Sequence, residues 1–372
     1  MFKRSLVFIM LLSALAFTNE SQASRARLIV LGTGDAGMLL DGAITAAGTV
    51  AYGGGGSFFY NDPYNMFYNP SYVNDFKDWA VVEKSNFAGP AFAGGSTAQG
   101  GFVTSFFNFN IGVYVNRIDA VRTLSVASAA ATRPIEITFG ADMGVKWGLG
   151  VLVANRNTAT ATDQIYTIRA GAQFMDFDPF VHYSVGGQDQ TGGTSNHTAM
   201  TFGMRYHWGE WIPFATYRQD KTTTAATNVD NKTDAWGVGM GRESKVSDSM
   251  KTMYSIAFVR ATSTAAADHS VVPFNFGVEG DVTSWLTLRA GLGYNVYDKT
   301  GGNSAGDTTT GRIGASIKVG KADLAFAFGK AGFSAGTQTT GEAPSGTAQN
   351  VDGQNFDLGS GLFTAASLSY KW

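Results

Sequence analysis

The stretch from Arg27 to Gly37, "RLIVLGTGDAG", places glycines at the spacing Gly32-x-Gly34-x-x-Gly37. This spacing matches a dinucleotide-binding fingerprint, in which the glycines allow close backbone approach and a helix N-terminus faces a pyrophosphate. The fingerprint needs a strand before it and a βαβ unit around it. Because no βαβ repeat follows, we interpret the three glycines as positions of a sharp turn or of close packing.

Histidine and cysteine offer little further chemistry. The chain contains no cysteine, and its four histidines are not paired at metal-ligand spacing, which argues against a zinc site. His197 and His269 fall near predicted loops, where barrel-borne hydrolases carry catalytic groups, but loop histidines without such a role are far commoner. We therefore expect no catalytic residues, no metal, no cofactor and no enzymatic activity. A formal net charge of −2 gives no electrostatic basis for binding nucleic acid.

The N-terminus resembles a targeting segment. A basic start, "MFKR", precedes an apolar run over residues 5–17 and the small residues of Ser21-Gln22-Ala23. This pattern predicts a secretory signal peptide over residues 1–23, cleaved after Ala23, with an apolar run too short to cross a bilayer as a helix. Export removes the chain from the cytosol, where dinucleotide cofactors are kept, and further weakens the nucleotide interpretation.

The composition narrows the class of the exported protein. Among 372 residues there are 47 glycines and no cysteine, 15% of the residues are charged, and 13% are aromatic. Without cysteine, no disulfide framework can stabilise the chain. A glycine-rich and aromatic-rich exported chain of low charge is typical of a transmembrane β-barrel, whose alternating strands do not raise the averaged hydropathy.

Several segments alternate with a period of two. In residues 200–208, methionine, phenylalanine, tyrosine and tryptophan share one face, and threonine, glycine, arginine and histidine share the other. Residues 286–296 repeat the pattern, with Leu288 and Leu292 on the apolar face and Gly291 on the polar one. The polar faces contain mostly Gly, Thr, Ser and Asn, which suits a wet lumen better than the Lys-rich and Glu-rich surface of a soluble sandwich. A serine in place of Gly291 is accordingly expected to be tolerated.

The pattern predicts an all-β fold, a transmembrane antiparallel β-barrel of about sixteen strands. Tight turns alternate with longer Thr/Ala/Gly-rich loops, as expected for periplasmic and outer connections, and an even count returns the chain to its starting side. The predicted strands lie near residues 79–87, 98–107, 110–118, 135–145, 147–156, 163–174, 177–186, 197–208, 211–220, 232–243, 250–262, 269–281, 284–297, 308–320, 322–331 and 362–372.

Tryptophan placement supports the same topology. Indole rings favour the membrane interface. Six of the seven tryptophans are predicted to lie at the periplasmic ends of strands: Trp79, Trp147, Trp208, Trp211, Trp285 and Trp372. The exception is Trp236. The final stretch, "SLSYKW", resembles the terminal signal read by the outer-membrane insertion machinery, which we expect as an assembly partner.

Residues 24–78 precede the barrel and do not alternate well. Within "DPYNMFYNPSYVNDF", Asn69-Pro70-Ser71 resembles the Asn-Pro-Ala motif near the N-terminus of FadL-type transporters and related porin-like barrels. The order Gly-x-Gly, Gly-rich patch, "NMFYNPSY" and "WAVVE" is also similar to major outer-membrane proteins of predatory deltaproteobacteria. The resemblance covers about the first third of the exported chain and the last strand. Ser71 replaces the usual alanine, and FadL-type barrels have fourteen strands, which is the alternative count.

The expected organisation is therefore a signal peptide (1–23), an N-terminal hatch in the lumen or a periplasmic segment (24–78), and a transmembrane barrel (79–372). The resemblance implies a hatch motif formed by Asn69, Pro70 and Ser71. The expected location is the outer membrane of a Gram-negative cell. Expected partners are outer-membrane lipid and lipopolysaccharide and small solutes, with a homo-oligomer as one potential assembly.

Charged residues on the inward faces are the candidates for a pore lining. They would either form salt bridges that stiffen the barrel or a constriction that tunes ion preference. The predicted lining residues are Glu136, Asp142, Arg169, Arg205, Glu279, Arg289, Arg312 and Lys318.

Three functions fit these features. The polar inward faces favour a porin for passive diffusion of small hydrophilic solutes and ions. The Asn-Pro motif and the N-terminal aromatic residues favour a FadL-like transporter of hydrophobic molecules. A structural or adhesive surface protein would need only the outer loops.

Overall fold

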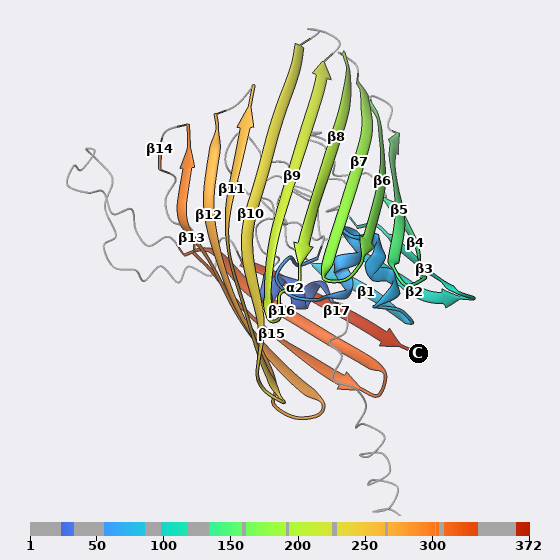
Figure 1. Cartoon of the computed structure of the whole chain (residues 1–372), viewed down its shortest axis with the longest axis vertical. Helices are drawn as coiled ribbons and strands as arrows, with labels where there is room; N and C mark the ends of the chain where they lie inside the picture. Colours follow the sequence, from blue (N-terminus) through green and yellow to red (C-terminus); the bar gives the residue numbers. More distant parts are fainter. Residues whose placement is uncertain are drawn as a thin grey trace, which may run out of the picture.

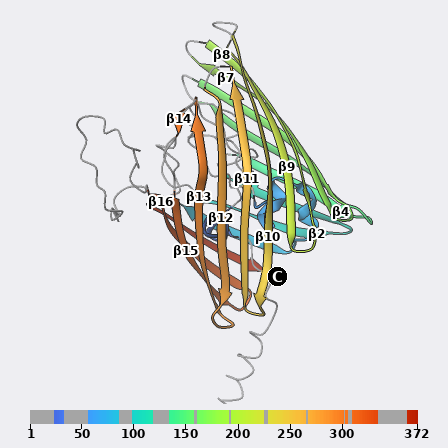
Figure 2. The same ribbon diagram turned by 60° about the vertical axis from the view of Figure 1, so that its left-hand side comes forward.

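The described strands of the computed structural model form a closed antiparallel barrel (Figures 1 and 2). Neighbouring strands pair in chain order, and β1 pairs with β17 to close the sheet. β14 is a two-residue arm on β13, and β13 pairs directly with β15, so sixteen of the described strands make the barrel wall. The structure describes residues 24–32, 56–85, 98–117, 134–157, 161–190, 193–224, 229–264, 267–301, 303–304, 309–333 and 362–372.

The helical elements within the described residues are all short and precede the barrel. They are α2 (Arg25–Leu31) and the 3₁₀ helices η2 (Pro63–Phe67) and η3 (Pro70–Asn74). The strands are β1 (Trp79–Ser85), β2 (Ala98–Phe106), β3 (Phe109–Val115), β4 (Ile135–Asp142), β5 (Lys146–Asn157), β6 (Ala161–Gln173), β7 (Phe177–Gln190), β8 (Gly193–Tyr206), β9 (Trp211–Thr224), β10 (Val229–Ser247), β11 (Met250–Ser263), β12 (His269–Asp281), β13 (Leu286–Thr300), β14 (Asn303–Ser304), β15 (Thr309–Val319), β16 (Ala322–Phe333) and β17 (Leu362–Lys371).

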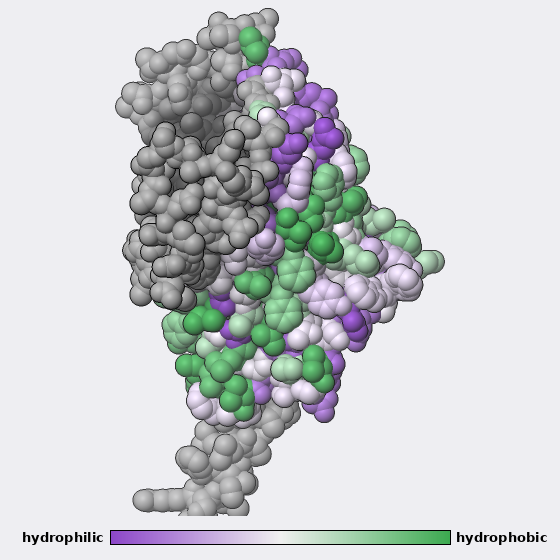
Figure 3. Space-filling view, turned by 90° about the vertical axis from the view of Figure 1, so that its left-hand side faces the viewer, coloured by the Kyte–Doolittle hydropathy of each residue, from purple (hydrophilic) through white to green (hydrophobic). Residues whose placement is uncertain are grey.

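The alternation of the sequence becomes the two faces of the wall. On β8, Met200, Phe202 and Met204 face outward and are exposed, whereas Thr201 and Arg205 face the lumen and are buried. Figure 3 shows hydrophobic side chains gathered over the middle and lower part of the visible strands, with hydrophilic ones toward the upper end. An outward apolar band on a closed barrel is the surface that hydrocarbon requires.

The predicted count of sixteen strands is confirmed, and the predicted bounds differ mainly at the outer ends. β10 was expected over residues 232–243 and spans Val229–Ser247. Its outer part pairs with β9 as a polar hairpin, in which Thr223 Oγ1 donates to Asp230 Oδ1 at 2.6 Å and Lys221 Nζ lies 2.8 Å from Asp230 Oδ2. Cross-strand polar pairs thus extend the strands into what the sequence presented as loop.

Most of the tryptophans predicted for the periplasmic ends lie at strand ends on the tight-turn side, which we take as the periplasmic side. Trp208, Trp285 and Trp372 are well exposed there. Trp79 is different: it is buried, and its indole N–H donates to Phe76 O at 3.0 Å. Trp79 does lie at the periplasmic end of β1, as predicted, but its ring points inward because Trp79 shares the inward face of β1 with Val81.

Two described segments lie inside the barrel. Residues 24–32, with α2, and residues 56–78, with η2 and η3, occupy the periplasmic half of the lumen in Figures 1 and 2 (blue). We call these two segments together the plug. Among the structure's described helices, none is long and apolar enough to cross a membrane. Residues 1–23, the predicted signal peptide, lie outside the described part of the chain.

Candidate functional site

The helix α2 begins and ends at capping residues. Ser24 Oγ accepts a hydrogen bond from the backbone N of Arg27 at 3.0 Å, and Gly32 follows the helix with a φ of 89°. Only glycine adopts that backbone conformation without strain. A helix, rather than a strand, therefore precedes Gly32, which is opposite to the order that a dinucleotide fingerprint needs. Gly34 and Gly37 lie outside the described residues.

Inward-facing glycines of the wall receive α2. A Cβ on Gly314 would lie 2.7 Å from Val30 Cγ2, and one on Gly277 would lie 3.1 Å from Leu31 Cδ2. A Cβ on Gly291 would overlap the carbonyl oxygen of Val30. These glycines allow the helix to lie directly on the sheet. The expectation that Gly291 tolerates serine was wrong, because its lumenal face contacts backbone and not water.

Replacing Gly291 with alanine is expected to cost about 1–3 kcal/mol, the usual penalty for overpacking a filled interior. The clash is with backbone, so α2 must shift as a whole. Gly280→Ala is the matched control, since its Cβ would meet nothing closer than 3.8 Å. Chemical unfolding in detergent micelles measures both variants. Equal stability of the two would mean that α2 does not rest on this glycine.

Arg27 on α2 centres a buried ion cluster. Its Nη1 lies 2.6 Å from Asp62 Oδ2, and its Nε donates to Glu279 Oε2 at 2.9 Å. Arg289 Nε donates to the same Glu279 oxygen at 2.5 Å. The guanidinium of Arg27 also lies over the ring of Tyr60, 4.8 Å from its centroid. The cluster joins the two plug segments to β12 and β13.

Glu83 fixes the start of α2 at the seam where β1 closes on β17. Its Oε1 accepts from the backbone N of Arg25 at 2.6 Å and from Ser367 Oγ, on β17, at 2.8 Å. Its Oε2 accepts from Tyr114 Oη at 2.6 Å and also contacts the hydroxyl of Tyr64. Burial raises the pKa of the Tyr64 hydroxyl well above its ordinary value, so that it remains a neutral hydrogen-bonding group. The plug thus bridges the two strands that close the barrel.

The predicted hatch motif lies on the opposite wall. Asn69 caps η3, since its Oδ1 accepts from the backbone N of Ser71 at 3.1 Å and from Ser71 Oγ at 2.6 Å. Its Nδ2 donates to the carbonyl of Ala172 at 3.2 Å. A Cβ on Gly148 would overlap Pro70, and one on Gly171 would overlap Asn69. The motif is therefore a packing site between η3 and the strands β5 and β6.

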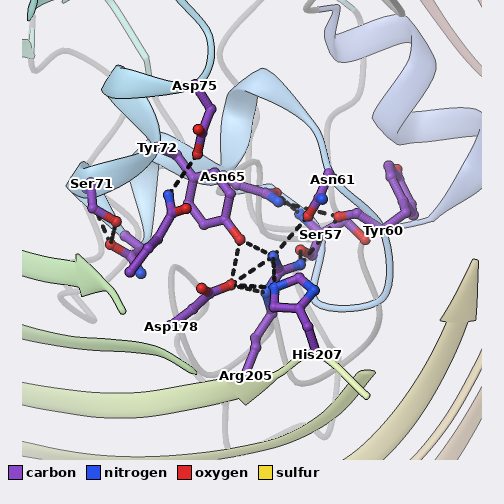
Figure 4. A network of polar contacts seen from close by, with 12 residues as sticks. Ser57, Tyr60, Asn61, Asn65, Ser71, Tyr72, Asp75, Asp178, Arg205 and His207 are labelled. Carbon is purple, nitrogen blue, oxygen red and sulfur yellow. Dashed lines mark hydrogen bonds and ion pairs between the residues drawn. The ribbon is translucent and has the colours of Figure 1, made fainter. Parts of the chain in front are cut away.

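Arg205 holds the second plug segment at the periplasmic side (Figure 4). Its Nη2 donates to Asp178 Oδ2 at 3.0 Å and to Asn61 Oδ1 at 2.9 Å. Tyr72 Oη donates to Asp178 Oδ2 at 2.5 Å, and His207 Nε2 lies 2.7 Å from the same oxygen. Burial raises the pKa of the Tyr72 hydroxyl well above its usual range, which keeps it protonated as a donor. Asp178 is consequently the common acceptor of plug and wall.

Glu136 makes a third cluster toward β6. Arg117 Nε donates to Glu136 Oε2 at 3.0 Å, and Arg169 forms an ion pair with the other carboxylate oxygen. The guanidinium of Arg117 stacks over Phe67 of η2, 4.1 Å from the ring centroid. Desolvated cation–π contact of this kind strengthens the attachment of η2 to the wall.

The predicted lining residues therefore divide into two groups. Glu136, Arg169, Arg205, Glu279 and Arg289 face inward and are buried in the ion clusters between plug and wall. Arg312 is also buried, and it lies against Gly32 at the end of α2. A Cβ added to Gly32 would lie 2.9 Å from Arg312 Nη1.

The other two predicted lining residues lie near the periplasmic rim. Asp142 is exposed at the end of β4, where its Oδ1 accepts from Gly144 N at 3.2 Å, so it does not line the lumen. Lys318 Nζ lies 3.8 Å from Asp281 Oδ1.

Several site residues were not predicted from the sequence: Arg27, Asp62, Glu83, Arg117 and Asp178. Two of them lie in the plug, where no periodicity assigns a face. Glu83 had a usable signal, because it is two residues from Val81 on the same face of a predicted strand. Among the described residues, no group of three or more His, Asp or Glu side chains could hold a metal ion.

An apolar core fills the space between the clusters. Phe58 stacks on Tyr68 with ring centroids 4.9 Å apart, and its ring centroid lies 5.3 Å from that of Phe214 in the wall. Phe67 meets Tyr114 of β3 edge-on at 5.0 Å. These plug side chains are buried, with relative exposures of 0–1%. Plug and wall therefore share one packed core.

Comparison with known proteins gives distant structural matches. No protein-family profile and no curated protein sequence matches the chain. The outer-membrane channel DcaP of Acinetobacter baumannii is 12% identical, over 79% of this chain and 95% of that one, with a TM-score of 0.41. A loop-deletion mutant of OmpT, an outer-membrane protein of Vibrio cholerae, is 12% identical over 79% and 98%, with a TM-score of 0.41. A mutant of the TodX monoaromatic hydrocarbon channel is 10% identical over 90% and 99%, with a TM-score of 0.38.

The structural agreement is low in all three matches, so the barrel assignment rests on this chain's own features. These are the closed strand pairing, the outward apolar band and the tight turns at one end. Lipid-spanning barrels of this kind belong to outer membranes. The chain is a sixteen-stranded outer-membrane β-barrel with an N-terminal plug packed in its lumen.

Proposed function

We propose that the protein is a plugged outer-membrane transporter of small amphiphilic molecules, in which the plug must rearrange before a solute passes. The observation that carries this proposal is the contact of the plug with the wall around the lumen. α2 lies on β12, β13, β15, β16 and β17, and η3 lies on β3, β4, β5 and β6. Phe59 lies against Gly241 of β10. Packing of the described plug segments against both sides of the lumen favours a gated path over the open water path of a passive porin.

The side chains on the lumenal face of the wall support an amphiphilic solute. Leu152, Ala154 and Ile165 form a buried apolar strip on the lumenal face of β5 and β6. A second apolar strip on β10, β11 and β12 comprises Ala235, Val259, Ala261 and Val271. Between them, β7, β8 and β9 present the polar side chains of Ser184, Thr201, Thr216 and Arg218. Apolar walls with a few convergent polar groups are typical of small-molecule sites.

Uptake into liposomes tests the proposal. The probe is a fluorescent long-chain alkyl sulfonate, whose charged headgroup prevents spontaneous crossing, and a neutral oligosaccharide of similar mass is the comparison. We expect protein-dependent entry of the sulfonate, and entry of the oligosaccharide no faster than into protein-free liposomes. Rapid entry of the oligosaccharide would instead support a passive porin for hydrophilic solutes.

A further inference from the structure

The two plug segments are held in different surroundings. On the α2 side, the Arg27 side chain is 1% exposed, Asp62 0%, and Glu279 10%. The helix rests on backbone-to-backbone contacts at the wall glycines, where Gly291 lies against the carbonyl of Val30. Moving α2 would expose a buried ion cluster and open a void against a flat glycine surface.

The periplasmic edge of η3 is hydrated by comparison. Asp75, directly after η3, forms an ion pair with Lys146 in which the side chains are 24% and 35% exposed. Asp75 Oδ2 also accepts from Gln173 Nε2 at 2.8 Å. His207, which contacts Asp178, is 28% exposed. Water can replace the contacts of Asp75 and His207 as they break, because these side chains already face it. The Asp178–Arg205 pair beside them is buried, with side chains 4% and 0% exposed.

A cavity of about 240 Å³ adjoins this edge of η3. Tyr72 and Phe76 form its plug side, and the ends of β5, β6, β7 and β8 form its wall side. The full lining is Asn61, Tyr72, Asp75, Phe76, Lys146, Gln173, Met175, Asp176, Asp178 and His207. The cavity is large enough for several water molecules and for the ring of Tyr72 to turn into it. The same residues therefore provide the space, and the hydration, that a moving segment needs.

The chain after η3 has a backbone feature that suits a pivot. Asp78, next to the first residue of β1, has a φ of 61°, in the left-handed region that non-glycine residues rarely adopt. Its carbonyl accepts from Trp372 N at 3.1 Å and its Oδ1 accepts from Ser105 N at 3.2 Å, so the wall holds this residue in place. Motion of η3 would then turn about a fixed end of β1.

We propose that η3 is the gate of the plug, that its periplasmic edge with Tyr72 turns into the cavity at β5–β8 to open the exit for the solute, and that α2 stays docked. This inference rests on the proposed function and adds which part of the plug moves. The latch is the set of contacts that joins Tyr72 and Asn61 to Asp178, Arg205 and His207 (Figure 4). The glycine surface under α2 is the fixed support, and η3 must lift from its own wall glycines, Gly148 and Gly171, to open.

Two disulfides separate the roles of the segments, because the chain has no cysteine of its own. A Cβ on Gly140 would lie 2.7 Å from Val73 Cγ1, and a Cβ on Gly314 would lie 2.7 Å from Val30 Cγ2. In each pair the new Cβ would lie close to the position of the partner's sulfur in the closed state. The new Cβ would also lie 2.5 Å from Trp147 O at Gly140 and 2.6 Å from Phe326 O at Gly314, so the wall must shift slightly to admit either cysteine. Val73→Cys with Gly140→Cys ties η3 to β4, and Val30→Cys with Gly314→Cys ties α2 to β15.

Uptake of the alkyl sulfonate into liposomes is measured for both variants, oxidised and after reduction with dithiothreitol. We expect the oxidised η3–β4 variant to fall to the level of protein-free liposomes and to recover on reduction. The α2–β15 variant is expected to transport equally in both states. The reduced forms of both variants serve as controls for folding.

Three other outcomes would overturn the gate. Loss of uptake with the α2–β15 disulfide alone would assign the motion to α2. Loss with both disulfides would mean that the plug moves as one body, and retention with both would mean that the solute passes without either segment moving. Absence of uptake by the wild-type protein would overturn the proposed function itself, and the gate with it.

Discussion

Replacing Arg27 with methionine is expected to lower the free energy of unfolding by about 3–5 kcal/mol, because it leaves the buried Asp62 carboxylate without its cation and leaves Glu279 with Arg289 alone. Asp62 and Glu279 would both lose a partner, and the attachment between the two plug segments would break. Methionine retains most of the side-chain volume, so the effect reports charge rather than packing. Urea unfolding in detergent micelles, followed by tryptophan fluorescence, gives the measurement.

Lys146→Met is the control for Arg27→Met. It also removes an ion pair between plug and wall, but both partners of that pair are partly exposed. Exposed pairs contribute about 0–1 kcal/mol, so this variant is expected to unfold close to the wild type. If the two substitutions cost the same, the Arg27 cluster is solvated and does not anchor the plug.

Leu292→Arg is expected to destabilise the barrel by roughly 2–4 kcal/mol, since it places a charge near the middle of the apolar band. Leu292 is 41% exposed on the outward face of β13. The control is Val319→Arg on the same outward surface but at the end of β15, where a charge near the interface costs about 0–1 kcal/mol. Folding yield into liposomes and unfolding in urea give the difference. Equal tolerance at both positions would show that this face of β13 does not contact lipid.

The wall could be predicted from the sequence because its signal is local. Alternation in residues 269–281 and 286–296 assigns each side chain to a face without reference to any distant part of the chain. Tight turns then set the register, as with Glu279 and Arg289, which pair directly across the β12–β13 connection. Asp178 and Arg205 also pair directly, but β7 and β8 are joined at the outer end, far from both residues. The pairing of Asp178 with Arg205 therefore could not be predicted by counting residues from a tight turn.

The plug could not be predicted in the same way. Residues 56–78 have no period, and their contacts depend on which wall residues surround them. The sequence of α2 did contain helix-capping signals, with serine before "RARLIVL" and glycine after it. The spacing of the glycines also matches a nucleotide-binding motif, which hides the capping pattern. In the sequence, the glycines on the polar faces of the strands favour the interpretation of a water-filled lumen. Their true role depends on the close approach of α2, and sequence alone gives no sign of that contact.

Conductance in planar bilayers tests most directly whether the plug closes the lumen. The wild-type protein is compared with a chain lacking residues 24–78, and heat-modifiable migration in gels confirms that each barrel is folded. A sixteen-stranded barrel without its plug has a lumen wide enough to hold water. We expect the wild type to carry currents near the baseline and the truncated chain to carry large, steady ones. Large, steady currents through the wild type, unchanged by the truncation, would contradict the account.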